Sequence, residues 1–152
     1  MDKERVLEKE IDLIQGCINR MASNSFIIKG WLISLVAIVL ALLPEKFDIR
    51  LLCVICLVIT FCFWYVDGFF LKTERLYRWK YEWVIKKRLT TEKYCYDLDP
   101  YNEAMWLINK DGKNKKNPWV ITAMFSKTLI PIYIPIIVLI TFMFLNSYIN
   151  WF

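Results

Sequence analysis

Three long apolar runs divide the chain, and polar or charged stretches separate them. The runs cover about residues 26–44, 51–71 and 128–145. Each run is close to the ~20 residues that an α-helix needs to cross the hydrocarbon core of a bilayer. A soluble domain buries its apolar residues in shorter segments, so the pattern predicts an all-α membrane protein with three transmembrane helices.

A different pattern precedes the first run. In residues 1–25, apolar side chains recur at spacings of four, three, four and three, which places them on one narrow face of an amphipathic helix. Such a face fits two interpretations. It could pack on the protein's own cytoplasmic segment, or it could form a contact between subunits, since about 3.5 residues is the repeat of a coiled coil. The face consists of Leu7, Ile11, Ile14, Ile18 and Met21.

The first two spans are joined only by the short connection PEKFDIR, which predicts a tight antiparallel hairpin. The second span continues without a proline into a charged stretch, so residues 51–88 are expected to form one long helix. Residues 89–118 lack a regular pattern and are expected to pack on the cytoplasmic helices. The predicted organisation is a cytoplasmic amphipathic helix (1–25), a transmembrane hairpin (26–71, with spans 26–44 and 51–71), a basic helical cytoplasmic segment (72–127), a third transmembrane helix (128–149) and an external tail (150–152).

Two prolines mark the start of the third span. Pro131 and Pro135 lie four residues apart, and each lacks the backbone donor that a helix uses for its hydrogen bonds. We expect them to bend this helix, either as a static kink or as a hinge.

The charge distribution orients the chain in the membrane. Of the twenty Lys and Arg residues, five lie before or at the start of the first span, thirteen lie between the second and third spans, and two lie in PEKFDIR. One side of the membrane therefore receives eighteen basic residues, five plus thirteen. The positive-inside rule then predicts a cytoplasmic N-terminus and an external C-terminus, with membrane lipid as a partner.

One acidic residue, Asp67, lies among aromatic residues near the end of the second apolar run. It should face protein or water, because an unpaired charge in lipid costs ~2.5 kcal/mol or more near the bilayer centre and less toward the interface. Its basic partner is expected from the first helix or the third span, and Lys127, just before the third span, is the favoured one. Lys29, one turn inside the first apolar run, is expected to extend its ammonium group to the lipid headgroups.

Polar side chains continue from Asp67 along the same predicted helix. Glu74 lies seven residues after Asp67 and shares its face, and Glu74 and Arg78 have the i, i+4 spacing of a helix salt bridge with the acid first. Arg75 lies on the adjacent flank. We expect Asp67, Glu74, Arg75, Arg78 and Lys127 to form a polar network that couples the cytoplasmic segment to the membrane.

The remaining basic clusters form a second candidate surface. They are expected to contact anionic lipid headgroups or, alternatively, to bind an anionic ligand or a partner protein. The residues are Lys86, Lys87, Arg88, Lys113, Lys115 and Lys116.

The sequence offers little catalytic chemistry. It contains no histidine, the usual general base and the commonest zinc ligand, and no phosphate-binding, dinucleotide-binding or nucleophile-elbow motif. Cys53 and Cys56 form a C-x-x-C, but the pair lies inside a predicted span and has no second pair to complete a metal site. We therefore expect no enzyme activity, no cofactor, no metal and no nucleic-acid partner.

Three stretches, RMASNSFIIKGW (20–31), DGFFLKTERLYR (67–78) and FSKTLIPIY (125–133), resemble small bacterial membrane proteins that lie near defence genes, including genes for TIR-like or nucleotide-signalling proteins. The layout of cytoplasmic helix, membrane hairpin and long cytoplasmic helix, over about residues 2–88, is similar to that of SLATT-type effector families. The third span departs from their two-span pattern. The resemblance implies an effector that perforates the inner membrane once a cytoplasmic sensor triggers it.

Two functional hypotheses follow from these observations. The leading one is a homo-oligomeric inner-membrane effector of anti-phage defence, which permeabilises or depolarises the membrane on a cytoplasmic signal. A soluble defence protein or a nucleotide-type molecule would supply that signal. The alternative is a non-conducting membrane anchor that holds a soluble partner protein through its basic, aromatic-rich surface.

Overall fold

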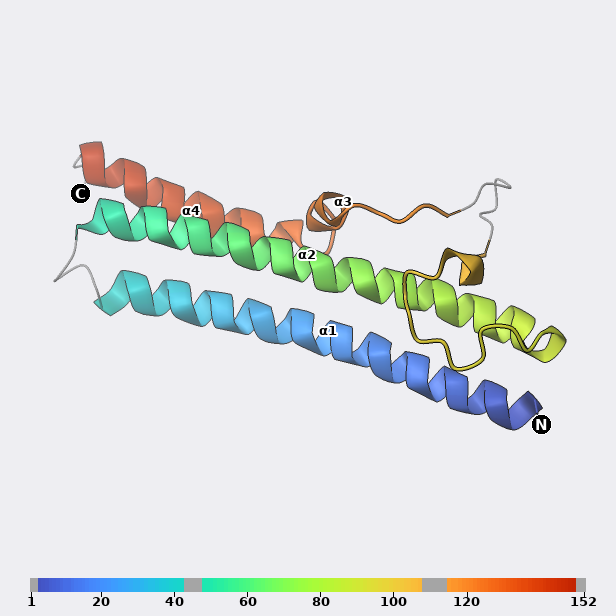
Figure 1. Ribbon diagram of the computed structural model, residues 1–152. Helices are drawn as coiled ribbons and strands as arrows, with labels where there is room; N and C mark the ends of the chain where they lie inside the picture. Colours follow the sequence, from blue (N-terminus) through green and yellow to red (C-terminus); the bar gives the residue numbers. More distant parts are fainter. Residues whose placement is uncertain (1–2, 43–47, 108–114, 150–152) are drawn as a thin grey trace. The chain divides into compact units, whose positions relative to one another are not determined.

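The computed structural model describes residues 3–42, 48–107 and 115–149, and helices account for most of them (Figure 1). Three long helices carry the apolar runs: α1 (Lys3–Leu42), α2 (Ile49–Lys87) and α4 (Ile130–Ile149). Each is long and apolar enough to cross a membrane. The prediction of an all-helical chain with three candidate membrane spans is therefore confirmed for the described residues, among which there is no β-strand.

Three short helical elements lie between α2 and α4. Two single-turn 3₁₀ helices, Arg88–Thr90 and Glu103–Met105, lie in the segment after α2, and the five-residue helix α3 (Val120–Met124) precedes α4. Helix α3 was not predicted, because a five-residue helix is shorter than the windows in which periodicity can be detected.

The placement of proline explains why the long helices are uninterrupted. No proline occurs within α1 or α2, so their backbone hydrogen bonds can continue unbroken. In α4, Pro131 is the second residue, where the backbone N–H would lack an intrahelical partner in any case. Of the two prolines proposed as a hinge, only Pro135 lies inside the helix and removes an intrahelical donor. The bend itself stays a prediction.

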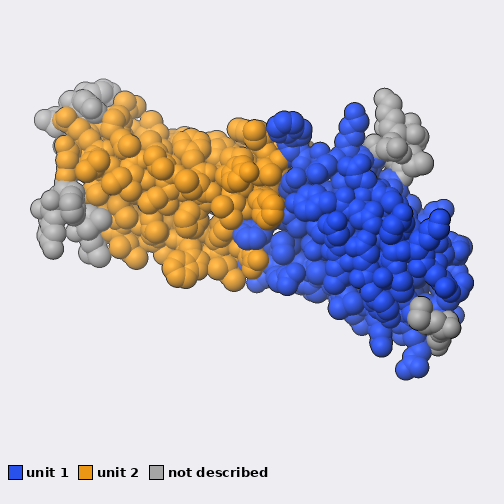
Figure 2. Space-filling model, viewed as in Figure 1, with its two compact units in different colours: residues 1–23, 70–119 blue, residues 24–69, 120–152 orange. Residues whose placement is uncertain are grey.

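The chain divides into two compact units (Figure 2). Unit 1 comprises residues 1–23 and 70–119, and unit 2 comprises residues 24–69 and 120–152. Unit 2 contains the apolar parts of the three long helices. Unit 1 contains the amphipathic start of α1, the charged end of α2 and the segment that follows it.

Unit 1 has a small apolar core. It is formed by buried side chains from α1, α2 and the second 3₁₀ helix: Ile14, Cys17, Tyr77, Trp83, Val84 and Met105. The other members of the predicted apolar face, Leu7, Ile11, Ile18 and Met21, are partly buried against this core. The intramolecular interpretation therefore accounts for the face that was considered as an oligomer seam.

Within unit 1, a buried ion pair joins the N-terminal part of α1 to the residue that follows α2. The Arg88 guanidinium binds both carboxylate oxygens of Glu10, and each side chain is only 2% exposed. Arg88 also donates to the backbone carbonyls of Lys93 (2.8 Å) and Tyr94 (3.0 Å), and Glu10 accepts the N–H of Tyr96. Arg88 was expected on a ligand-binding surface. That expectation is wrong, because its guanidinium is enclosed by these partners.

The same contacts stabilise a turn after α2 in which two residues have positive φ. Tyr94 and Tyr96 both have φ 57°, in the left-handed region that disfavours a residue with a Cβ by roughly 1–2 kcal/mol. The bonds from Arg88 to the Tyr94 carbonyl and from the Tyr96 N–H to Glu10 fasten this strained turn at both positions. The ion pair therefore determines the path of the chain after α2.

Removing one partner of this pair should destabilise unit 1. Glu10→Gln or Arg88→Met is expected to lower the free energy of unfolding by about 3–5 kcal/mol, because the other charge stays buried without its counter-ion. Urea denaturation in mild detergent, followed by tryptophan fluorescence, measures the change. The matched control is Glu92→Gln, which breaks the exposed Lys3–Glu92 pair and should alter stability by less than about 1 kcal/mol. Equal effects of both substitutions would contradict the assignment.

Candidate functional site

A carboxylate lies fully buried among the three helices of unit 2. Asp67 of α2 has no exposed side-chain surface. Its Oδ2 atom lies 2.8 Å from the Lys29 Nζ atom of α1 and accepts the Tyr133 hydroxyl of α4 at 2.9 Å. Its Oδ1 atom accepts the Ser25 hydroxyl of α1 at 2.5 Å. One acidic side chain therefore holds groups from both other long helices, and we call Asp67, Lys29, Ser25 and Tyr133 the Asp67 cluster.

The cluster also satisfies the lysine. Ser25 and Lys29 are four residues apart, so they project from the same face of α1. The Lys29 ammonium group lies within hydrogen-bonding distance of the Asp67 carboxylate, the Ser25 hydroxyl oxygen at 2.5 Å and the Ser25 carbonyl oxygen at 3.1 Å. These three oxygens match the three N–H donors of an ammonium group. The pair is thereby stabilised in an environment where an isolated charge would be strongly disfavoured.

The structure resolves which basic residue pairs with Asp67. A partner from the first helix or the third span was expected, with Lys127 favoured, whereas Lys29 occupies that place and Lys127 is exposed. The expected reach of Lys29 to the headgroups is also corrected, since its side chain is only 15% exposed. An antiparallel hairpin brings the beginning of the first span beside the end of the second. The predicted hairpin could therefore have indicated the Lys29–Asp67 pair.

Aromatic rings pack beside the cluster. The Trp64 ring of α2 stacks on Tyr133, with centroids 5.6 Å apart and planes 8° apart. The Trp64 indole N–H donates to the Met124 carbonyl at the end of α3, at 3.0 Å. Sequence analysis missed Tyr133 and Trp64, because both lie in apolar surroundings where an aromatic residue is unremarkable.

Three residues of the predicted polar network, Glu74, Arg75 and Arg78, lie in unit 1. Glu74 and Arg78 form the expected i, i+4 salt bridge, at 2.7 Å, and Arg78 is 61% exposed. Arg75 is partly buried. The Glu74 side chain is 14% exposed, so the exposure of this pair lies on the arginine side, and such an i, i+4 helix pair contributes about 0.3–0.5 kcal/mol.

The candidate basic surface is also divided. Lys86, Lys87 and Lys116 are exposed, whereas Lys113 lies outside the described residues. Lys115 pairs with Glu82 at 3.0 Å, and its ammonium group lies 4.9 Å from the centre of the Trp79 ring.

Beside these surfaces, an open groove of about 490 Å³ in unit 1 runs between α1 and α2. Gln15, Ile18, Asn19, Arg78, Tyr81 and Glu82 line it. The amides of Gln15 and Asn19 and the guanidinium of Arg78 give this groove several hydrogen-bond donors.

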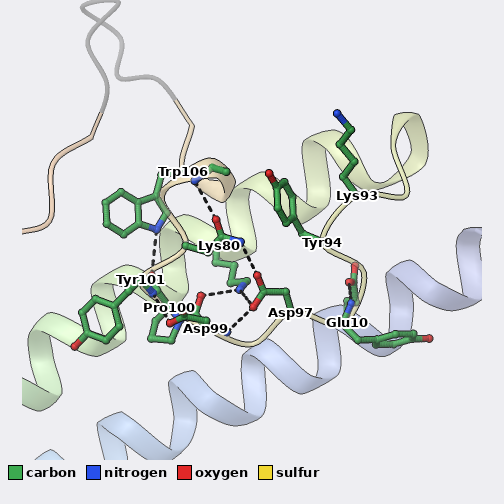
Figure 3. Close-up of polar contacts among 12 residues, drawn as sticks. Glu10, Lys80, Lys93, Tyr94, Asp97, Asp99, Pro100, Tyr101 and Trp106 are labelled. Atoms are coloured by element: carbon green, nitrogen blue, oxygen red, sulfur yellow. Dashed lines mark hydrogen bonds and ion pairs between the residues drawn. The ribbon is translucent and has the colours of Figure 1, made fainter.

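A second polar cluster in unit 1 surrounds a buried lysine (Figure 3). Lys80 of α2 is 1% exposed; its ammonium group pairs with the Asp97 carboxylate at 3.1 Å and donates to the Asp99 carbonyl at 2.8 Å. Asp97 also accepts the Asn102 side-chain N–H and the Asp99 backbone N–H. These bonds fasten the segment after α2 to the helix.

The pKa values of Lys80 and Asp97 are both lowered, for different reasons. Burial lowers the pKa of Lys80, and attraction to Asp97 offsets only part of the effect. Burial alone would raise the pKa of Asp97, but hydrogen bonds from Asn102, the Asp99 N–H and Lys80 lower it further, so it lies below its usual range. Asp97 keeps 25% of its side chain exposed, so water still solvates the carboxylate while Lys80 has lost nearly all of its water.

No metal site is visible in the described ranges: no group of three or more His, Cys, Asp or Glu residues there could hold an ion. Cys53 and Cys56 are buried free thiols in α2. Comparisons with protein-family models, with curated proteins and with solved structures found no match to this chain. The function must therefore be argued from the two units themselves.

A double-mutant cycle tests the Asp67 cluster. Asp67→Leu alone should destabilise unit 2 by about 3–5 kcal/mol, because it leaves the Lys29 charge buried without its partner. Lys29→Met combined with Asp67→Leu should recover most of that loss, since an apolar pair needs no counter-ion. Tryptophan fluorescence during titration of the purified protein with sodium dodecyl sulfate measures stability. Arg78→Met, at an exposed pair, is the control, and additive losses in the double variant would contradict the pairing.

The lowered pKa of Asp97 predicts a pH dependence. Because the carboxylate is more acidic in the folded protein than its ordinary value of 3.8, its stabilising contribution is present above that pH. It is lost as the pH falls from 3.8 through the lower pKa of the folded state. The stability difference between the wild type and Asp97→Asn should therefore be constant near neutrality and shrink below about pH 4. Urea denaturation at each pH tests this, with the exposed Glu103→Gln as control; a difference that widens in acid would contradict it.

Proposed function

We propose that this chain is a multi-pass protein of a bacterial inner membrane that acts as a homo-oligomeric effector of anti-phage defence. In this proposal it permeabilises or depolarises the membrane when unit 1 receives a cytoplasmic signal. The N-terminus and unit 1 face the cytoplasm, and the C-terminus lies outside. The distribution of eighteen basic residues against two supports this orientation.

The observation that carries the proposal is the Asp67 cluster. Ionisable groups inside membrane segments are rare, and they commonly belong to sites of conduction, transport or switching. An ion pair between helices is stable only in the packing that brings its partners together, so it favours one arrangement of the helices over others. We infer that the Asp67–Lys29 pair holds a closed arrangement, and that a rearrangement of the helices would turn its charges toward water.

Unit 1 offers a place for the signal to act. Its groove is lined by residues of α1 and α2, the same two helices that supply Lys29 and Asp67 in unit 2. A polar ligand or a partner protein that binds there would bias these helices directly. Arg78 uses two of its N–H groups on Glu74, and Glu82 also lines the groove. The Asn19 amide and the other N–H groups of Arg78 suit an anionic, nucleotide-type molecule, and the exposed Lys86 and Lys87 suit an acidic partner protein.

A non-conducting anchor is the second candidate, and one observation favours it. The large side chains exposed on the membrane helices include Ile38, Val58, Val138 and Phe142, which suit contact with lipid. In the same unit the charges of Asp67 and Lys29 are paired within one chain. An anchor would use the Asp67 cluster only to fasten its three helices together.

The two candidates differ in what loss of the ion pair does. If the pair holds a closed state, Asp67→Asn should depolarise cells without a trigger and raise the ion leak of reconstituted liposomes at least about tenfold. That factor corresponds to weakening the closed state by only about 1.4 kcal/mol. A potential-sensitive dye measures depolarisation, and Glu92→Gln serves as the control.

The apolar double variant Lys29→Met with Asp67→Leu should stay silent, because it keeps the helices together without charges. A folded Asp67→Asn protein that leaks no more than the wild type, in cells and in liposomes, would refute the gating role and favour the anchor.

A further inference from the structure

The short helix α3 is held tightly against α2 within unit 2. A Cβ atom added to Gly68 would lie 2.6 Å from the Cγ atom of Met124, so any other residue at this position would require Met124 to move. The Trp64 indole bonds to the Met124 carbonyl, and the Ala123 side chain is fully buried. These contacts place α3 beside Gly68, one residue after Asp67 in the chain.

Large apolar side chains of and beside this element are exposed, together with the polar Thr122. Ile121 is 56% exposed and Phe125, immediately after α3, is 60% exposed, although the Phe125 ring also contacts Trp64 edge-on. Trp119, which precedes α3 in the chain, is 77% exposed. Large apolar side chains are therefore displayed on a short element that packing holds in place.

Two physical limits determine the depth at which such an element is stable. Exposed Ile and Phe side chains are less stable in water than in an apolar environment. The carbonyls of Ile121, Ala123 and Met124 accept hydrogen bonds. The first N–H groups of a helix, however, have no intrahelical partner, and such groups are disfavoured in hydrocarbon. The headgroup layer meets both limits, because it is wet enough for the backbone and apolar enough for the side chains.

The charge of this part of the chain fits an anionic surface. Lys127 is exposed two residues after Phe125, and no acidic residue follows Asp111 in the sequence. A lysine near an anionic leaflet gains a favourable interaction, whereas a carboxylate would oppose it. The apolar surface also continues along the chain into α4, where Ile134 and Val138 are exposed.

We propose that Ile121, Phe125 and Lys127 form a lipid-binding anchor, which seats α3 in the headgroup layer of an anionic leaflet. The two apolar side chains insert beneath the headgroups, and the Lys127 ammonium group binds their phosphates. This lipid-binding surface goes beyond the proposed permeabilising activity. It does not depend on that activity, since the non-conducting alternative would make the same lipid contact.

Photo-crosslinking tests the proposal on the full chain. Phe125 is replaced by p-benzoyl-phenylalanine, and the protein is placed in nanodiscs made of equal parts phosphatidylglycerol and phosphatidylcholine. Mass spectrometry then identifies the adducts formed on illumination. The same probe at Phe142, exposed on α4, is the positive control, and the probe at Leu89, exposed in unit 1, is the negative control.

We expect lipid adducts at positions 125 and 142. Phosphatidylglycerol should be enriched at 125 relative to 142 by about fivefold, the factor that one lysine near an anionic surface contributes. Lys127→Gln should remove that enrichment. Adducts at 142 but not at 125, adducts of 125 with a second protein copy, or a lipid ratio at 125 that Lys127→Gln leaves unchanged would each overturn the proposal.

A second measurement uses the unmodified protein. Hydrogen exchange of the amides of residues 120–126 should be slower in phosphatidylglycerol nanodiscs than in pure phosphatidylcholine nanodiscs, because anionic headgroups hold α3 more firmly. Equal exchange in the two bilayers would overturn the proposal even if the benzoyl variant failed to fold.

Discussion

The buried carboxylate of Asp67 is the constraint on which unit 2 depends. An unpaired charge in such surroundings would be so unfavourable that the neighbouring helices must supply partners, and they do so with an ammonium group and two hydroxyls. Lateral packing of apolar helices in lipid has little directional preference of its own, since lipid tails are as apolar as leucine. A single polar contact can therefore determine which faces of three helices meet.

Unit 1 uses the same device in different surroundings. Both members of the Glu10–Arg88 pair are buried, Lys80 of the Lys80–Asp97 pair is buried, and both pairs are supplemented by backbone hydrogen bonds. They fasten a segment with little regular structure, whose turn contains two tyrosines in the left-handed region. Buried ion pairs add less to net stability than apolar packing would, but removing either partner is severe. Their value here is that they select one path for an otherwise irregular chain.

The sequence predicts the long helices well, because length and hydrophobicity are local properties of consecutive residues. The inward orientation of Asp67 and the Glu74–Arg78 bridge also follow from local rules, a desolvation cost and a four-residue spacing. What escaped prediction depends on distant residues: Glu10 and Arg88 are 78 positions apart, and Tyr133 reaches Asp67 from 66 positions away. The choice of Lys29 over Lys127 depends on helix pairing, and α3 depends on its contact with Gly68, which no window of sequence records.

That contact has a consequence for how the sequence can change over time. Glycine at position 68 and methionine at position 124 fill one shared volume, because the Met124 side chain occupies the space that any Cβ at position 68 would require. The Met124 side chain is flexible, so a smaller residue at 124 could make room for alanine at 68. The two positions are therefore expected to vary as a pair, with the tolerance of each set by the size of the other. A larger residue at position 68 alone would require the Met124 side chain to leave its place beside the Asp67 cluster.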